Sequence, residues 1–114
     1  MKTLAELELS TKDRGAVEAA ADLLRSRFPV DQVVLFGSKA RGTDDAESDI
    51  DLLVVTSRPL SWQERHSLID ALFDVELNHD VVISTLVVFQ DDWENGPWRV
   101  VPIRKNIERD GAAA

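Results

Sequence analysis

The chain has 114 residues, with 13 Lys and Arg against 21 Asp and Glu, a formal net charge of −8 and no cysteine. This length fits one domain, which we place at residues 1–114, and the missing cysteine excludes disulfides, zinc-thiolate sites and a cysteine nucleophile. No apolar run reaches the roughly 20 residues that cross a bilayer. Glu6 and Glu8 fall where a signal peptide needs apolar residues. We therefore expect a cytoplasmic domain without a membrane partner.

The acidic balance argues against direct binding of nucleic acid, which depends on Lys and Arg contacts to phosphate. The acids are unevenly distributed, because five of them lie within residues 44–51: Asp44, Asp45, Glu47, Asp49 and Asp51. A solvated loop is one interpretation of such a cluster. The flanking sequence decides how much of it is functional.

The first expected element is a helix that ends before Pro29. Ser10 or Thr11 offers an N-cap, and Asp13 lies in the first turn, where a carboxylate complements the helix dipole. Apolar residues then recur at helical spacing: Val17, Ala20, Ala21, Leu24 and Phe28. This stripe predicts that one face of the helix is buried.

Three short apolar runs predict buried strands at residues 32–36, 50–55 and 80–88. Between the first two runs, a polar, glycine-flanked connection from Ser38 to Asp49 begins with a predicted single helical turn. Between the second and third runs, Ser61 and Glu64 have the spacing of a capping box, which predicts the start of a second long helix.

That second helix is expected to close at Asn78 and His79. Residues 90–97 are predicted to form a loop, and a last short helix is expected over residues 103–109. The final alanines, residues 112–114, are expected to add little. Helices and strands in this order indicate an α/β (α+β) domain, with a small mixed sheet packed against helices.

Three tryptophans, Trp62, Trp93 and Trp98, lie at the ends of predicted elements or in loops. Exposed aromatic residues at such positions often anchor partners, whereas buried ones cover a small core. The sequence leaves both interpretations open.

The segment from Gly37 to Asp51, GSKARGTDDAESDID, joins a glycine-serine turn at the end of one predicted strand to two carboxylates on the next. A glycine allows the backbone to approach a ligand closely. If Ser38 opens a helical turn, free amides and its hydroxyl form an anion site for phosphate. Lys39 and Arg41 add positive charge there.

Asp49 and Asp51 are two residues apart at the start of a strand, so their side chains point to one face. Two neighbouring carboxylates repel, and a bridging cation relieves the repulsion. Oxygen-only ligands beside a phosphate site favour Mg²⁺, which binds one or two carboxylates together with substrate phosphates. Such an ion would let an acidic protein bind a nucleoside triphosphate.

The spacing of Gly37-Ser38 and Asp49-Ile50-Asp51 resembles the signature of the DNA polymerase β-type nucleotidyltransferase superfamily. The strings LFGSKARG and SDIDLLVV resemble its minimal nucleotidyltransferase (MNT) branch. The resemblance extends from the first helix through the third strand, and more weakly to NIERDG near the C-terminus. It implies a polymerase β-like nucleotidyltransferase core.

What the resemblance implies is transfer of a nucleoside monophosphate from a triphosphate to an acceptor hydroxyl, with release of pyrophosphate. Two Mg²⁺ ions would assist an in-line displacement. Asp49 and Asp51 would carry the metals, and Ser38 with the Gly37 backbone would hold the outer phosphates of ATP.

The family has a third carboxylate on the next strand, which ligates the catalytic metal and helps to deprotonate the acceptor. Asp80 is assigned to this role, because it comes directly before apolar β-residues. A plain turn residue is the alternative for this position. Rival acids lie nearby: Glu64, Asp74 and Glu76.

A core of this size lacks an extra helical domain that would shape an acceptor pocket, so a partner is expected to provide the acceptor. MNT proteins are typically antitoxins that transfer AMP to a tyrosine of a HEPN-type ribonuclease toxin and bind it in a hetero-oligomer. We expect this function. An aminoglycoside-type nucleotidyltransferase with a small-molecule acceptor, and a non-catalytic module that masks a toxin or senses nucleotide, are the alternatives.

Overall fold

The computed structural model describes residues 1–44 and 47–114, so Asp45 of the acidic cluster lies outside the described residues. Within this part of the chain, one mixed sheet has the strand order β1-β5-β2-β3-β4. The strands span Lys2–Thr3 (β1), Val30–Phe36 (β2), Ile50–Thr56 (β3), Ile83–Phe89 (β4) and Ala112–Ala113 (β5). The expected α/β fold with a small mixed sheet is confirmed.

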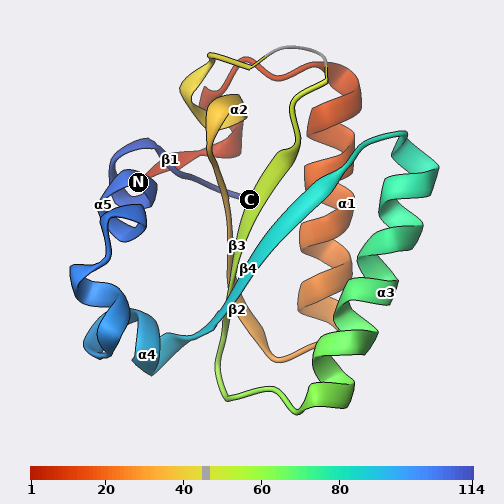
Figure 1. Cartoon of the computed structure of the whole chain (residues 1–114). Coiled ribbons are helices and arrows are strands. Elements are labelled where there is room, and N and C mark those ends of the chain that lie inside the picture. Colours follow the sequence, from red (N-terminus) through yellow and green to blue (C-terminus); the bar gives the residue numbers. More distant parts are fainter. Residues whose placement is uncertain (45–46) are drawn as a thin grey trace.

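Helices cover both faces of this sheet. The helices span Thr11–Arg27 (α1), Ser38–Arg41 (α2), Trp62–His79 (α3), Gln90–Asn95 (α4) and Pro102–Asp110 (α5), with short 3₁₀ helices at Leu4–Glu6 (η1) and Pro97–Val100 (η2). Figure 1 shows α1 and α3 side by side on one face, with α4 and α5 on the other. None of the described helices combines the length and the apolar character that crossing a membrane requires.

The two long helices begin as the sequence predicts. The Ser10 hydroxyl accepts a hydrogen bond from the Asp13 amide at the start of α1. At the start of α3, the Glu64 amide donates to the Ser61 hydroxyl and the Ser61 amide donates to the Glu64 carboxylate, which completes the capping box. These contacts fix where each helix starts relative to the sheet.

The sheet separates two clusters of buried apolar side chains. Ile50, Leu52 and Val54 of β3 pack with α1 and α3. Leu53 and Val55 of the same strand pack on the opposite side, in a cluster with Trp93 and Ile107. Because side chains alternate along a strand, Asp49 and Asp51 belong to the same face as Leu53, the face that carries α4 and α5.

The predicted loop at residues 90–97 was wrong, because residues 90–95 form α4. Asp91 and Asp92 lie in its first turn, where they complement the helix dipole, and Trp93 is buried against the sheet. The polar residues therefore belong to the exposed side of a short helix.

Two further expectations about the strands need correction. Ala112 is fully buried and pairs with β2 as part of β5, so the terminal alanines do contribute to the sheet. Residues 80–82 of the predicted third strand precede β4, because α3 continues to His79 and Asp80 forms its C-cap. The strand itself begins at Ile83.

Candidate active site

Asp49 and Asp51 lie at the start of β3, which pairs with β2 on one side and β4 on the other. Asp51 is opposite Phe36 of antiparallel β2 and beside Ser84 of parallel β4. Asp49 is exposed and Asp51 is half-buried. The two carboxylates therefore face the same side of the sheet, as the sequence predicts, at the end where β2 leads into α2.

Gly37 brings the backbone directly against Asp51. It follows β2 with a φ of 76° and a ψ of −156°, a backbone conformation that residues other than glycine rarely adopt. A Cβ atom added at this position would lie 2.2 Å from Asp51 Oδ2. The glycine therefore provides the space in which the Asp51 carboxylate sits, and Ser38 begins α2 immediately afterwards.

The surroundings of Asp49 and Asp51 do not supply enough positive charge to balance the two carboxylates. Burial raises the pKa of Asp51 above its ordinary value, the negative charge of Asp49 raises it further, and Arg41 partly opposes both effects. Arg41 is exposed at the end of α2. A cation between the two carboxylates would remove their repulsion, so the oxygen ligands of Asp49 and Asp51 fit a hard divalent ion that also takes phosphate oxygens.

Ser84 is a site residue that the sequence did not single out. Its hydroxyl donates a hydrogen bond of 3.3 Å to Asp49 Oδ2 across the β3–β4 pair. The only signal in the sequence is the pair of hydroxyl residues Ser84 and Thr85 within an otherwise apolar run. Strand register, which the sequence does not state, decides that this hydroxyl lies beside the carboxylates.

Lys39 does not lie free beside the pair. Its ammonium is buried and contacts Asp13 of α1 at 2.8 Å and Asp44 at 3.2 Å. Burial alone would lower the pKa of Lys39, but the hydrogen bonds to the two carboxylates outweigh it and raise the pKa. In this structure the side chain ties α2 to α1. Its predicted role in nucleotide binding remains a prediction.

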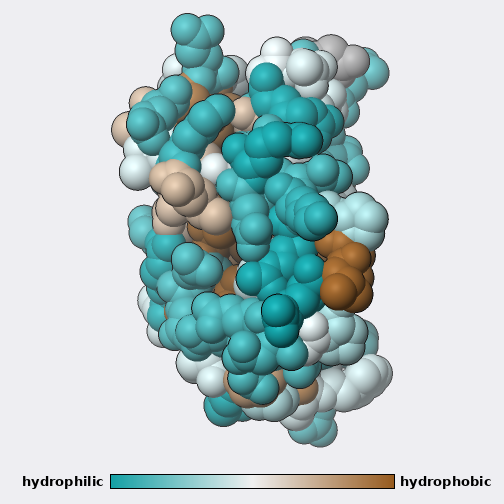
Figure 2. Space-filling view, turned by 90° about the vertical axis from the view of Figure 1, so that its left-hand side faces the viewer, coloured by the Kyte–Doolittle hydropathy of each residue, from teal (hydrophilic) through white to brown (hydrophobic). Residues whose placement is uncertain are grey.

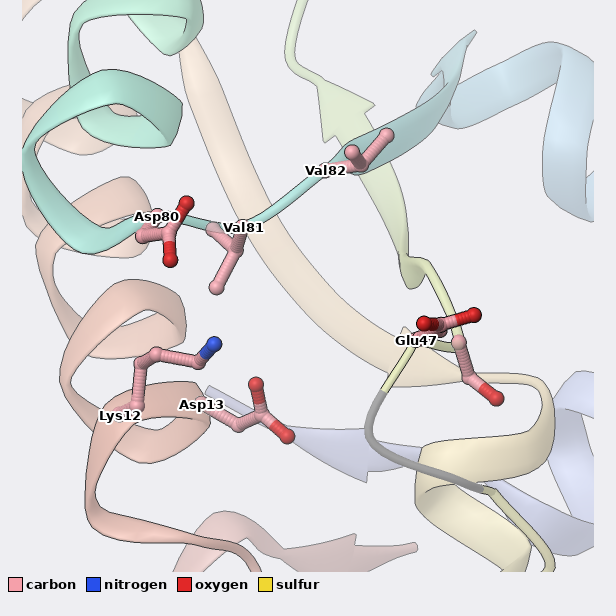
Figure 3. A pocket seen from close by; sticks show the side chains of 7 residues that line it. Lys12, Asp13, Glu47, Asp80, Val81 and Val82 are labelled. Carbon is pink, nitrogen blue, oxygen red and sulfur yellow. The ribbon is translucent and has the colours of Figure 1, made fainter.

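Asp80 does not form a three-carboxylate group with Asp49 and Asp51 in the described part of the chain. It is exposed at the C-cap of α3, in the left-handed conformation with a φ of 54°. It lines a small pocket of about 170 Å³ together with Lys12, Asp13 and Glu47. Figure 3 shows Asp80 and Lys12 on one side of this pocket and Glu47 on the other. The backbone of Asp80 is therefore that of a turn residue.

The rival acids are also engaged elsewhere or exposed. Glu76 accepts a hydrogen bond from the Ile83 amide, Glu64 pairs with Arg58, and Asp74 is exposed on α3. Among residues 1–44 and 47–114, no three His, Asp or Glu side chains are grouped so that they could hold a metal. The third carboxylate remains a prediction that substitution of Asp80 has to test.

The sequence of residues 17–111 matches the family described as nucleotidyltransferase domain, and the chain belongs to this family. A candidate protein adenylyltransferase of Methanocaldococcus jannaschii is 36% identical over 58 residues, which cover 51% of this chain and 59% of the relative. The family predicted from the GS and DxD motifs is thereby confirmed.

Solved structures share the fold. A candidate minimal nucleotidyltransferase has a TM-score of 0.59 at 24% identity, with 89% of each chain covered. A toxin-antitoxin complex with AMP-PNP has a TM-score of 0.59 at 20% identity, covering 84% of this chain and 69% of the other. An MNT antitoxin bound to tri-AMPylated Shewanella oneidensis HEPN toxin has a TM-score of 0.54 at 18% identity, covering 89% and 70%.

Proposed function

We propose that the chain is a Mg²⁺-dependent protein adenylyltransferase that transfers AMP from ATP to a tyrosine of a HEPN-type ribonuclease toxin and thereby acts as an antitoxin. One observation carries this proposal: Asp49 and Asp51 lie on one face of the sheet, and Asp51 lies directly against the Gly37 turn. Membership of the nucleotidyltransferase family supports it.

In the proposed reaction, the acceptor oxygen forms a bond to the α-phosphorus of ATP and the bond from that phosphorus to the bridging oxygen breaks. Pyrophosphate leaves, and the acceptor proton passes to a carboxylate, for which Asp80 is the predicted residue. Asp49 and Asp51 would hold the metal, which when bound supplies charge stabilisation for the displaced oxygens. Ser38 and the Gly37 backbone would orient the outer phosphates.

The acceptor and partner are proposed from the relatives. An MNT antitoxin of this fold is bound to an AMPylated HEPN toxin, and another complex of the fold holds AMP-PNP. The M. jannaschii relative supports a protein acceptor. A complex of this chain with a HEPN-type partner would be a hetero-oligomer within the cytoplasm.

A non-catalytic module that binds nucleotide and masks its partner is the second candidate. One observation favours it: the described residues contain two facing carboxylates but no cluster of three. A two-carboxylate site can bind a metal-nucleotide complex and still lack the base that turnover needs.

The deciding experiment incubates the chain with ATP labelled at the α-phosphate, Mg²⁺ and the HEPN-type product of an adjacent gene. Label on the partner is expected, and D49N/D51N is expected to abolish it. The matched control is E18Q/D22N, which removes two exposed carboxylates from α1 and should leave labelling unchanged. Inhibition of the partner without label would support the masking module instead, and labelling by D49N/D51N would show that the site is assigned wrongly.

A further inference from the structure

The outer face of α3 carries a stripe of large apolar side chains that the fold leaves uncovered. Trp62 is 72% exposed, Ile69 52%, Phe73 54% and Leu77 66%. Their spacing of seven, four and four residues places them on one side of the helix. By contrast, Figure 2 shows that the face that carries α4 and α5 is mainly hydrophilic, with a hydrophobic patch at its right-hand edge and smaller hydrophobic areas between polar side chains.

This stripe continues onto the edge of the sheet. A groove of about 500 Å³ is lined by Trp62, Arg65, His66 and Ile69 of α3 and by residues 85–87 of β4. In the described sheet, β4 pairs only with β3. Its seven residues, ISTLVVF, include neither a charge nor a proline, the devices that usually protect an exposed edge strand. Helix stripe and strand edge therefore form one surface suited to a partner.

The charge beside this surface indicates what covers it. Helix α3 contains four Asp and Glu against one Arg, so the helix that carries the stripe is acidic on balance. Asp70 and Asp74 are exposed and follow one border of the stripe by helical position, and Glu76 lies on the β4 side. A second copy of the chain would place acid against acid, whereas a basic partner would find complementary charge.

We propose that the apolar stripe of α3 and the edge of β4 bind a helix of a partner protein whose apolar face is flanked by Lys and Arg. The inference rests on the proposed function in one respect, because it names the surface that would hold the protein acceptor. Apolar side chains in the groove would supply the affinity, and the acids along α3 would set its orientation and its dependence on salt.

The test uses a fluorescein-labelled amphipathic helical peptide of Leu and Lys, and its counterpart with Glu in place of Lys, with the full chain and anisotropy as the readout. We expect saturable binding of the Leu/Lys peptide, about tenfold weaker binding of the Leu/Glu peptide, and about tenfold weakening between 50 and 500 mM salt. No saturable binding of the Leu/Lys peptide overturns the proposal.

Matched variants separate this surface from general stickiness. I69S/F73S should weaken binding about tenfold, whereas V100S, which removes an apolar side chain that is 86% exposed elsewhere, should not. D70K/D74K should weaken binding about tenfold, whereas E18K/D22K on α1 should change it less than about threefold. Equal effects of test and control variants would overturn the proposal.

Two further measurements test whether a second copy of the chain covers this surface and whether peptide binding is independent of the proposed transfer. Sedimentation should show a monomer, and a wild-type dimer that I69S/F73S dissociates would assign the surface to a second copy and overturn the proposal. D49N/D51N should bind the peptide as the wild type does. Binding that persists while labelling of the partner fails in the wild type would therefore refute the proposed transfer alone.

Discussion

Replacing Gly37 by alanine tests whether the turn and the Asp51 carboxylate form one unit. Gly37 has a φ of 76° and a ψ of −156°, and an added Cβ would lie 2.2 Å from Asp51 Oδ2 and 3.1 Å from its Cγ. Gly42 offers a matched control, because it also has a positive φ of 75° but nothing lies within 4 Å of an added Cβ. Both substitutions place alanine at a positive φ, but Gly42 is in the left-handed helical region and Gly37 in a region that is essentially restricted to glycine. Only G37A also meets Asp51.

The backbone of G37A costs about 1–3 kcal/mol, and moving Asp51 off its rotamer adds about 1 kcal/mol. G42A should cost only about 1–2 kcal/mol, the penalty of a left-handed alanine. For a domain of this size these values correspond to a fall in Tm of roughly 10–15 °C for G37A and about 5 °C for G42A. G37A should also abolish nucleotide transfer, and G42A should preserve it.

Thermal unfolding of a double-mutant cycle with D51A measures the contact itself. In the D51A background, G37A should lose the part of its cost that comes from displacing the carboxylate, which gives a coupling free energy of about 1 kcal/mol. An equal cost of G37A in both backgrounds, together with unchanged labelling of the partner, would refute the close packing of this turn on Asp51.

Three further predictions concern charge. Lys39→Met should lower the free energy of unfolding by about 3 kcal/mol, because it leaves Asp13 buried without its partner, and K39M/D13L should recover most of this in chemical denaturation. Because the pKa of Asp51 is raised in the fold, the metal-free protein loses stability as the pH rises above 3.8, the pKa of this carboxyl in the unfolded chain. D51N should therefore unfold at a higher temperature than the wild type at pH 7 and at the same temperature at pH 3. The Glu64 carboxylate should titrate near its pKa of about 2 by NMR, and its stabilising effect, full above pH 4.5, should fade toward pH 2; R58A should move the titration back toward 4.5.

The sequence predicts most of the local structure because caps and periodicity are encoded within a few residues. Ser61 and Glu64 specify the start of α3, and the run from Ile50 specifies β3. The Asp49-x-Asp51 spacing also predicts correctly that both carboxylates face one side of the sheet, since strand alternation needs no knowledge of neighbouring strands. The short helix α4 was missed because polar residues in its first turn resemble those of a loop.

Contacts between distant segments could not be predicted from the sequence. Lys39 is basic and adjacent to the glycine-serine turn, which indicated a phosphate ligand, yet its partner Asp13 lies 26 residues earlier on another helix. Ser84 reaches Asp49 over 35 residues through strand register. Ala112 is buried because β1 and β2 flank it, and nothing in three alanines encodes that pairing. Each of these depends on tertiary packing.

Strand register also sets what Asp80 must do to serve as the third carboxylate. Ile50 pairs with Ile83 and Asp51 with Ser84, and the Ile50 amide donates to the carbonyl of Val82, the residue just before β4. Asp80 precedes Val82 by two residues, which is about 7 Å of extended chain. Asp80 lies just outside α3 as its C-cap, so the connection of residues 80–82 would have to place its carboxylate beside the pair for a role at the metal. If D80N keeps full transfer activity while D49N/D51N loses it, Asp80 is not the third carboxylate and the chemistry belongs to the β3 pair.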